Sequence, residues 1–291
     1  MVEVALSKTE RVIKRATPAP KLKEIIIYVL DLCRHKPIVG EAALNTILYF
    51  ADFIHYATSG RSITGVRYIK ESHGPVPAED ALTAAWDELV AESRLRVREE
   101  LSFDSPKRVP IVIGRADRAL FAKSELEIVD FVLNHFCKYS TTEIAGITSS
   151  DLGWRMAELG AEIPYHTVWI RRRNILTADA VERAMMRARL AHKGVSDSSM
   201  SWGRVASSHP FDANWQRLER EHPRGADVLA DIVYVLSREP RQFNKVDDAS
   251  RLWAVRTDEG PWERTPALDV VYQIDELMGT VTLLSAETAQ V

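Results

Sequence analysis

The 291 residues carry 38 basic and 41 acidic side chains, a net charge of -3, and 46% of them are hydrophobic. This composition excludes a disordered or collagen-like chain, and at about 100–200 residues per domain the length predicts two compact units. The longest apolar run, Ile25 to Leu30, has six residues. A bilayer-spanning helix needs about 20, so we predict no membrane-spanning segment and no membrane partner.

The start of the chain has several basic residues but no apolar stretch after them, which is not the pattern of a secretory signal. These residues are Lys8, Arg11, Lys14 and Arg15. We therefore expect a cytoplasmic protein. Two cysteines in 291 residues are also too few for a disulfide framework.

Two cysteine–histidine pairs, Cys33 with His35 and His135 with Cys137, could together supply a tetrahedral zinc set. Residues two apart on a helix point about 200° apart around its axis, so each pair would have to leave its helix to share one ion. We expect core packing instead, with no metal and no cofactor.

A segment rich in serine and glycine has no apolar period and is typical of a linker. This segment covers residues 194–203. Residues 1–199 have a net charge of +2, whereas residues 200–291 hold ten basic and fifteen acidic side chains, a net of -5. The predicted organisation is a tail, a first domain, a basic connecting helix, the linker and a second domain: residues 1–19, 20–170, 171–193, 194–203 and 204–291.

The first domain is predicted to be mostly helical, because apolar residues recur every three or four positions in several segments. Gly60 should end one helix as a left-handed cap. Ser124 and Glu127 form a capping-box pattern that should open another helix, with Phe131 on its buried side. The expected helices cover 22–33, 41–59, 78–93, 124–136, 142–147 and 150–159.

A small amount of sheet is predicted in the same domain. Residues 62–70 look like a short strand. The segment His73–Pro77 should turn the chain, because its two prolines lack the amide hydrogens of a strand ladder. Apolar residues at 95–97 and 109–113 predict a hairpin around Pro106.

Tyr49, Asp52 and His55 recur every three residues on one helical face. They could form an acid–base cluster, but no nucleophile or metal motif accompanies them, so we favour a polar seam that holds the helix against the His73 turn. The sequence Gly74-Pro75-Val76-Pro77 has too few glycines and no Lys-Ser/Thr ending for a phosphate loop. It predicts a rigid turn that presents an extended segment to a partner.

The second domain is predicted to be α+β, in the order strand, helix, helix and a three-strand meander. Apolar and polar residues alternate cleanly in the middle strand of the meander. Prolines 223 and 240 bound the second helix. The expected elements cover 204–208, 212–221, 224–238, 251–257, 267–275 and 280–286.

One ordered set of residues in the first domain is distinctive: Leu44-Asn45-Thr46-Ile47-Leu48-Tyr49-Phe50-Ala51-Asp52, His55, Gly60, Ile63-Thr64, Tyr68, Gly74–Pro77, Asp151–Trp154 and Ile163–Tyr165. Over about residues 20–170 this set resembles the Panacea domain, the family of SocA-like antitoxins. The resemblance implies a mostly helical domain that binds a toxin protein and silences it without a catalytic step. It directs the expected toxin contact to Tyr49, Asp52, His55, His73, Gly74, Pro75, Val76, Pro77 and Trp154.

Residues 204–286 resemble the RelE/ParE superfamily of small toxins, through their element order and the segments 252–256, 270–275 and 281–284. Ribonuclease members use basic and aromatic groups, for which the candidates here are Arg251, Arg256, Arg264 and Tyr272. The net charge of -5 opposes binding to RNA, and the last five residues offer no His, Lys or Tyr to transfer a proton. We therefore expect no enzymatic activity, with ribosome-dependent mRNA cleavage as the alternative.

The strongest positive concentration lies in residues 171–193, which hold seven basic and two acidic side chains. Arg171, Arg172 and Arg173 could contact DNA, which would make the protein an autoregulator. No helix-turn-helix pattern, zinc motif or aromatic platform accompanies them. A solvated helix face, or one that lies against the acidic second domain, is the simpler interpretation.

The sequence as a whole predicts a toxin–antitoxin component that works by covering a toxin protein. The second domain is then either a toxin held in cis or a degenerate toxin fold that recognises a separately encoded toxin. The identity of the toxin and the oligomeric state stay open.

Overall fold

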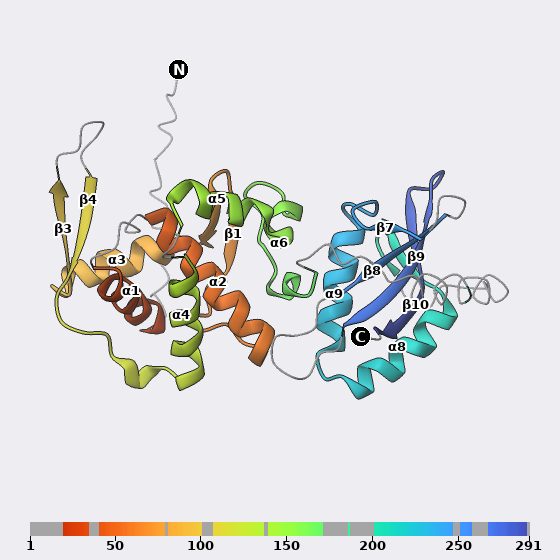
Figure 1. Ribbon diagram of the computed structural model, residues 1–291, viewed down its shortest axis with the longest axis horizontal. Coiled ribbons are helices and arrows are strands. Elements are labelled where there is room, and N and C mark those ends of the chain that lie inside the picture. The colour runs from red at the N-terminus through yellow and green to blue at the C-terminus, as the bar shows by residue number, and fades with distance from the viewer. Residues whose placement is uncertain are drawn as a thin grey trace, which may run out of the picture.

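The computed structural model describes residues 20–34, 41–78, 81–100, 107–136, 139–170, 186, 201–246, 251–257 and 267–289. Over these residues the chain is α+β (Figure 1). The N-terminal part is mostly helical with small hairpins, and the C-terminal part has a six-stranded mixed sheet with helices. This confirms the predicted class. The predicted tail, the basic helix 171–193 apart from residue 186, and most of the linker lie outside the described residues.

The long helix α2 (Glu41–Ser59) runs through the centre of the N-terminal part and contacts α4, α5, strand β2 and the short helix η3 (Tyr165–Val168). Its apolar stripe, which includes Leu48, is buried, and Gly60 ends it with φ of +76°. Both features were predicted. The other helices are α1 (Pro20–Leu32), α3 (Ala81–Ala91), α4 (Lys123–Phe136), α5 (Thr141–Ser150), α6 (Leu152–Met156) and η2 (Arg118–Leu120).

Strands β1 (Tyr68–Glu71) and β2 (Gly74–Pro77) form an antiparallel hairpin. The expected strand over 62–70 is therefore wrong for residues 62–67, and the turn is at residues 72–73 rather than along Gly74–Pro77. Ala78 N donates to Arg67 O at 2.7 Å, which fixes the register of the hairpin. In this register Pro75 and Pro77 occupy non-hydrogen-bonded positions, where a residue of β2 forms no backbone hydrogen bond with β1. For this reason the prolines do not break the pairing.

The predicted hairpin is confirmed as β3 (Leu95–Glu100) and β4 (Lys107–Val112). Pro106, in the turn expected between them, lies outside the described residues. The start of α4 differs from the prediction. The helix begins at Lys123, and the Glu125 side chain accepts a hydrogen bond from Ala122 N at 2.8 Å, so Ser124 is not its cap. Phe131 is 61% exposed, although the pattern placed it in the core.

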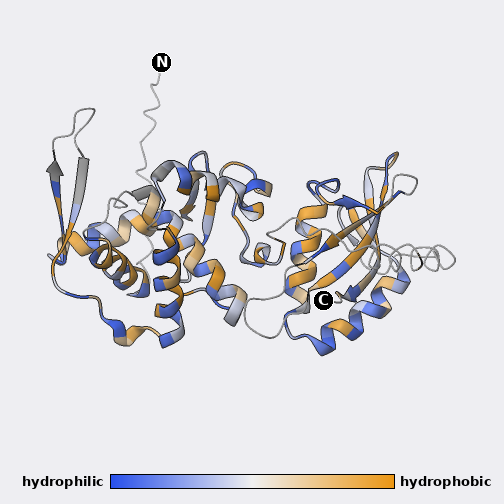
Figure 2. Ribbon diagram, in the orientation of Figure 1, coloured by the Kyte–Doolittle hydropathy of each residue, from blue (hydrophilic) through white to orange (hydrophobic). Residues whose placement is uncertain are grey.

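The C-terminal sheet has the strand order β5-β6-β10-β9-β8-β7, with β10 parallel to β6 and the other pairs antiparallel. Helices α8 (His209–Glu221) and α9 (Gly225–Leu236) share their core with alternate residues of β9, including Val270 and Tyr272. Figure 2 shows hydrophobic residues along α9 and the strands of the sheet, and a mixture of hydrophilic and hydrophobic residues along α8. The strands cover Ser201–Trp202, Val205–Ser207, Asn244–Lys245, Leu252–Arg256, Leu268–Asp275 and Thr280–Thr288, as β5 to β10 in chain order.

The predicted order of strand, helix, helix and three strands is present as β6, α8, α9, β8, β9 and β10. The prediction missed β7 and β5, each of two residues. Ser201 and Trp202, which form β5, had been assigned to the linker. Strands this short offer too few residues for an alternating pattern to be visible.

The two parts of the molecule meet at α9. Asp231, which is fully buried, accepts hydrogen bonds at Oδ2 from Trp169 N at 3.0 Å and Ile170 N at 2.8 Å. Arg224 donates from Nη1 to Tyr56 O at 2.8 Å, at the C-terminal end of α2. A cation there is favourable because the last carbonyls of a helix carry partial negative charge. Both contacts tie the second domain to the first through polar groups.

Candidate functional site

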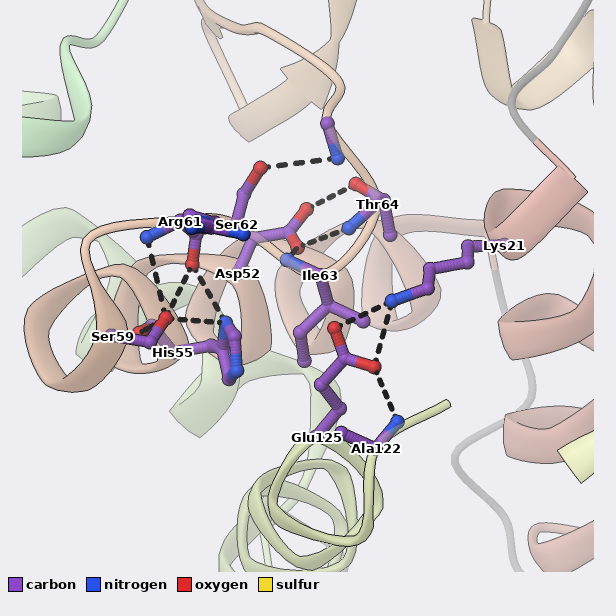
Figure 3. A network of polar contacts seen from close by, with 11 residues as sticks. Lys21, Asp52, His55, Ser59, Arg61, Ser62, Ile63, Thr64, Ala122 and Glu125 are labelled. Atoms are coloured by element: carbon purple, nitrogen blue, oxygen red, sulfur yellow. Dashed lines mark hydrogen bonds and ion pairs between the residues drawn. The ribbon is translucent and has the colours of Figure 1, made fainter. Parts of the chain in front are cut away.

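The polar seam predicted on α2 is centred on the carboxylate of Asp52 (Figure 3). Asp52 is fully buried and accepts hydrogen bonds from Ile63 N at 2.7 Å, from Thr64 N at 2.8 Å and from the Tyr68 hydroxyl at 2.8 Å. The Thr64 hydroxyl donates to the same group. Asp52 therefore folds the segment after α2 back against the helix and fixes the start of β1.

Burial raises the pKa of Asp52, and the hydrogen bonds from Thr64, Tyr68 and Ile63 oppose that shift. The pKa of Tyr68 lies well above its ordinary value because the hydroxyl is buried and sits beside the Asp52 charge. Neither side chain has surface available to a ligand, since both are fully buried. This arrangement is suited to holding a loop rather than to acid–base chemistry.

Tyr49, one turn before Asp52, connects α2 to α6. Its hydroxyl donates to Asp151 Oδ1 at 2.8 Å, and the same oxygen accepts from Trp154 N at 3.1 Å. Asp151 is thus the N-cap of α6. A Cβ atom on Gly153 would lie 2.3 Å from Thr167 Oγ1, so α6 approaches η3 as closely as it does only because residue 153 is glycine.

His55 lies at the other end of the seam. Its Nδ1 is 2.6 Å from Arg61 O and 3.1 Å from Ser59 Oγ. Ser59 Oγ also donates to His55 O and to Arg61 O. These contacts, drawn in Figure 3, close the chain reversal around Gly60. The seam is therefore confirmed as a satisfied polar network, but it anchors residues 61–68 and Asp151 rather than the His73–Pro77 segment.

The side chain of Lys70, on β1, holds the hairpin against α6. Its Nζ donates to Ala157 O at 2.9 Å and to Arg155 O at 3.1 Å, and it lies 4.5 Å from the centre of the Trp154 ring. It thus combines a helix C-terminal contact with a cation–π contact. On its other edge β1 pairs with residues 160–163, through bonds such as Ile163 N to Tyr68 O at 2.8 Å.

The hairpin and α6 together carry a set of outward-facing side chains that we call the hairpin–α6 surface. The hairpin tip is exposed at Glu71, Ser72 and His73, Trp154 is half-buried, and Leu159 is 68% exposed. Asp52 and Tyr49 lie beneath and fix both elements. The result is a surface of mixed polar and apolar groups on a braced backbone.

The structure divides the nine residues predicted to contact a partner into two groups. Of these nine, only His73 is exposed, and Val76 and Trp154 are half-buried. The other six are buried and can support the surface but not contact a partner directly: Tyr49, Asp52, His55, Gly74, Pro75 and Pro77. Sequence reasoning missed Lys70 and Leu159. It quoted Asp151 only as part of a motif, although an aspartate directly before Leu-Gly-Trp is an N-cap signal.

The structure describes three of the four catalytic candidates in the second domain. Arg256 forms a two-bond ion pair with Asp269, Nε to Oδ1 at 2.7 Å and Nη2 to Oδ2 at 2.8 Å. Tyr272 is fully buried, its hydroxyl donates to Pro240 O at 2.5 Å, and burial raises its pKa. Arg251 is exposed, and Arg264 lies outside the described residues.

The remaining sequence candidates have these positions. Cys33 is buried, whereas His35 and Cys137 lie outside the described residues, as do Arg171, Arg172 and Arg173. In the part of the chain that the structure describes, no three His, Cys, Asp or Glu side chains are grouped to hold a metal ion. No helix within that part is long and apolar enough to span a bilayer.

The comparison with protein families adds the decisive observation. Residues 44–155 match the family described as antitoxin SocA-like, Panacea domain. This Panacea region is shorter than the expected 20–170, but it contains most of α2, the Asp52 seam, the hairpin β1–β2 and most of α6. A SocA-like antitoxin domain indicates a component of a toxin–antitoxin system, and hence a toxin as its partner.

No curated protein and no solved structure matches the chain. The expected resemblance of residues 204–286 to the RelE/ParE toxins finds no support in the comparisons. The predicted order of elements is present in that domain, but element order alone is shared by unrelated proteins. The second domain is therefore described by its own structure: a six-stranded mixed sheet with two helices, tied to the first domain through α9.

Proposed function

We propose that the protein neutralises a separately encoded toxin by covering the toxin's working surface with the hairpin–α6 surface. The observation that carries the proposal is the bracing of that surface from within. Two residues of the Panacea motif hold the segments that lead into β1 and α6: Asp52 accepts from Ile63 N, and the Tyr49 hydroxyl donates to Asp151. The exposed side chains above them are therefore held in place before a partner arrives.

Bracing favours binding because less conformational freedom is lost when the complex forms. The side chains on this surface also suit a protein partner. Trp154 is half-buried with Lys70 against its ring, and Leu159 offers an exposed apolar group, so an aromatic anchor lies beside polar neighbours. Occlusion of this kind needs contact area and no covalent chemistry.

The proposal is tested by growth rescue in a bacterial host that expresses a toxin encoded beside this gene. Wild-type protein should restore growth, and Leu159→Asp together with His73→Glu should lose at least tenfold in rescue. The matched control is Val90→Asp on α3, where an exposed apolar residue, 44% accessible, is also replaced by an acid. Rescue by the double variant equal to that by the control would contradict the proposed surface.

A second candidate, that the C-terminal domain is itself the harmful part held in cis, is favoured by the contacts of Arg224 and Asp231 with the first domain. It predicts that the full chain with Arg224→Glu and Asp231→Arg slows the growth of its host, whereas the wild-type chain does not. Normal growth at equal levels of soluble, folded protein would contradict this candidate.

A further inference from the structure

A groove lies along helices α8 and α9 of the C-terminal domain, beside η3 of the first domain. Its volume is about 450 Å³, within the range of small-molecule sites. The walls include Trp215 of α8, Val233 and Tyr234 of α9, Trp202 of β5 and His166 of η3. Because η3 belongs to the N-terminal part, the groove sits at the junction of the two domains, where ligand sites are common.

Three side chains on these walls have buried polar atoms that make no hydrogen bond with the described residues. They are Trp215 Nε1, Tyr234 Oη and His166 Nδ1. Trp215 is only 2% exposed, so its indole N–H has little access to water. A buried donor without an acceptor costs about 1–3 kcal/mol, and such groups are uncommon in native proteins. Their concentration around one groove indicates that a ligand supplies the missing partners.

The chemistry of the three atoms restricts that ligand. An indole N–H can only donate, and a tyrosine hydroxyl donates readily, so the ligand must present an acceptor. Burial lowers the pKa of His166. The charge of Asp227 opposes this shift and that of Arg238 adds to it, so the imidazole is mainly neutral at pH 7 and available to donate or accept. Arg238 also lies at this groove, 3.8 Å from the centre of the Tyr234 ring.

The apolar part of the lining favours a flat ring. Two tryptophans and a tyrosine line the groove together with Leu229 and Val233. Aromatic walls stack on planar ligands, and the cationic Arg238 favours an anion over a neutral compound. Glu219, on the α8 side, disfavours a second negative charge on the ligand.

We propose that this groove, which we call the α8–α9 groove, binds a small planar aromatic monoanion, such as an aromatic carboxylate of one or two fused rings. The carboxylate accepts from the donors of Trp215 and Tyr234 and lies near Arg238. This site is separate from the hairpin–α6 surface and does not depend on the proposed toxin binding.

Isothermal titration calorimetry of the full chain with 1-naphthoate tests the proposal. Wild-type protein should bind one equivalent, and 1-naphthalenemethanol, which keeps the rings without the charge, should bind at least fivefold more weakly. Ala230→Trp should weaken naphthoate binding at least tenfold by filling the groove. Ala230 is exposed, so the larger side chain does not disturb the core.

Two further variants make the test specific. Ala213→Trp places the same side chain on an exposed position of α8 outside the groove and should bind naphthoate as wild type does. Tyr234→Phe removes one donor and keeps the ring, and should weaken binding about fivefold. Failure of wild-type protein to bind naphthoate at 5 mM would overturn the proposal. It would also be overturned by equal affinity of Ala230→Trp and Ala213→Trp, or by equal affinity for the charged and neutral compounds.

Discussion

Among the residues that the structure describes, one aspartate in each domain is completely buried, and both carboxylates bind the same kind of backbone feature. Asp52 on α2 accepts from the successive amides of Ile63 and Thr64, and Asp231 on α9 accepts from those of Trp169 and Ile170. The difference is where the amides come from. Those bound by Asp52 follow eleven and twelve residues later in the same domain, whereas those bound by Asp231 belong to the other domain.

A buried carboxylate that binds two successive backbone amides therefore has a different structural role in each domain. A buried carboxylate that receives several donors fixes a segment at one place, because any displacement leaves buried polar groups without partners. At Asp52 the fixed segment leads into the hairpin β1–β2 and so supports the hairpin–α6 surface. At Asp231 the fixed segment is the end of the first domain, so the same kind of carboxylate–amide contact holds the two domains together.

Removal of the Asp52 carboxylate should have the largest effect. Asp52→Ala leaves two backbone amides and the hydroxyls of Thr64 and Tyr68 without their acceptor, so we expect a loss of about 3–5 kcal/mol in the free energy of unfolding. Urea unfolding followed by circular dichroism measures it. Asp52→Asn keeps one acceptor oxygen and should lose less. A loss below about 1 kcal/mol in Asp52→Ala would show that the seam does not hold the loop.

Removal of Asp231 should lower the free energy of unfolding by less than removal of Asp52, but it should let the two domains unfold independently. Asp231→Ala leaves the amides of Trp169 and Ile170 unpaired, for which we expect about 2–3 kcal/mol. Scanning calorimetry should then resolve two transitions. Asp269→Ala is the matched control, since it breaks the ion pair with Arg256 inside the second domain. Two transitions in the control, or a single unshifted one in Asp231→Ala, would contradict the assigned role.

The smallest expected effect is on the pair formed by the buried Glu24 and the half-buried Arg94, which share two hydrogen bonds. Arg94 holds the pKa of Glu24 below its ordinary value of 4.5. Because the folded-state pKa is the lower one, the stabilisation is present above pH 4.5 and is lost as the pH falls through the folded-state pKa. We expect a loss on the order of 1 kcal/mol in the free energy of unfolding.

The test compares urea unfolding at pH 7 and at successive steps below pH 4.5, in wild type and in Glu24→Gln. The variant should have the flatter pH profile, because it has no proton to bind at this position. Identical slopes in the two proteins would show that Glu24 does not contribute to acid sensitivity.

Local patterns predicted much of the fold. The bounds of α2 and the cap at Gly60 follow from apolar spacing and one glycine, and β9 follows from clean alternation in Leu268, Val270, Tyr272 and Ile274. Tertiary context decided the rest. Phe131 fits a helical apolar stripe, yet α4 leaves it exposed. The proline-rich strand β2 could be recognised only once its register with β1 was known.

The candidate site was predicted in part. The sequence placed Tyr49, Asp52 and His55 on one face and indicated a satisfied seam, because three polar residues at helical spacing need partners when buried. It could not show which segment supplies those partners. Asp151 lies 102 residues from Tyr49, and Asp231 lies 62 residues from Trp169, so no local pattern records either pairing.

The register of the hairpin limits how any protein could attach to it. Since Pro75 and Pro77 occupy the positions of β2 whose nitrogen atoms face away from β1, that rim of the hairpin has no N–H at either position to offer an incoming strand. The opposite rim, along β1, is already taken by residues 160–163. A partner strand therefore finds no backbone N–H donor at Pro75 or Pro77, although their carbonyl oxygens can still accept hydrogen bonds, and the β1 edge is already paired. Regular strand addition to this hairpin is disfavoured at both edges.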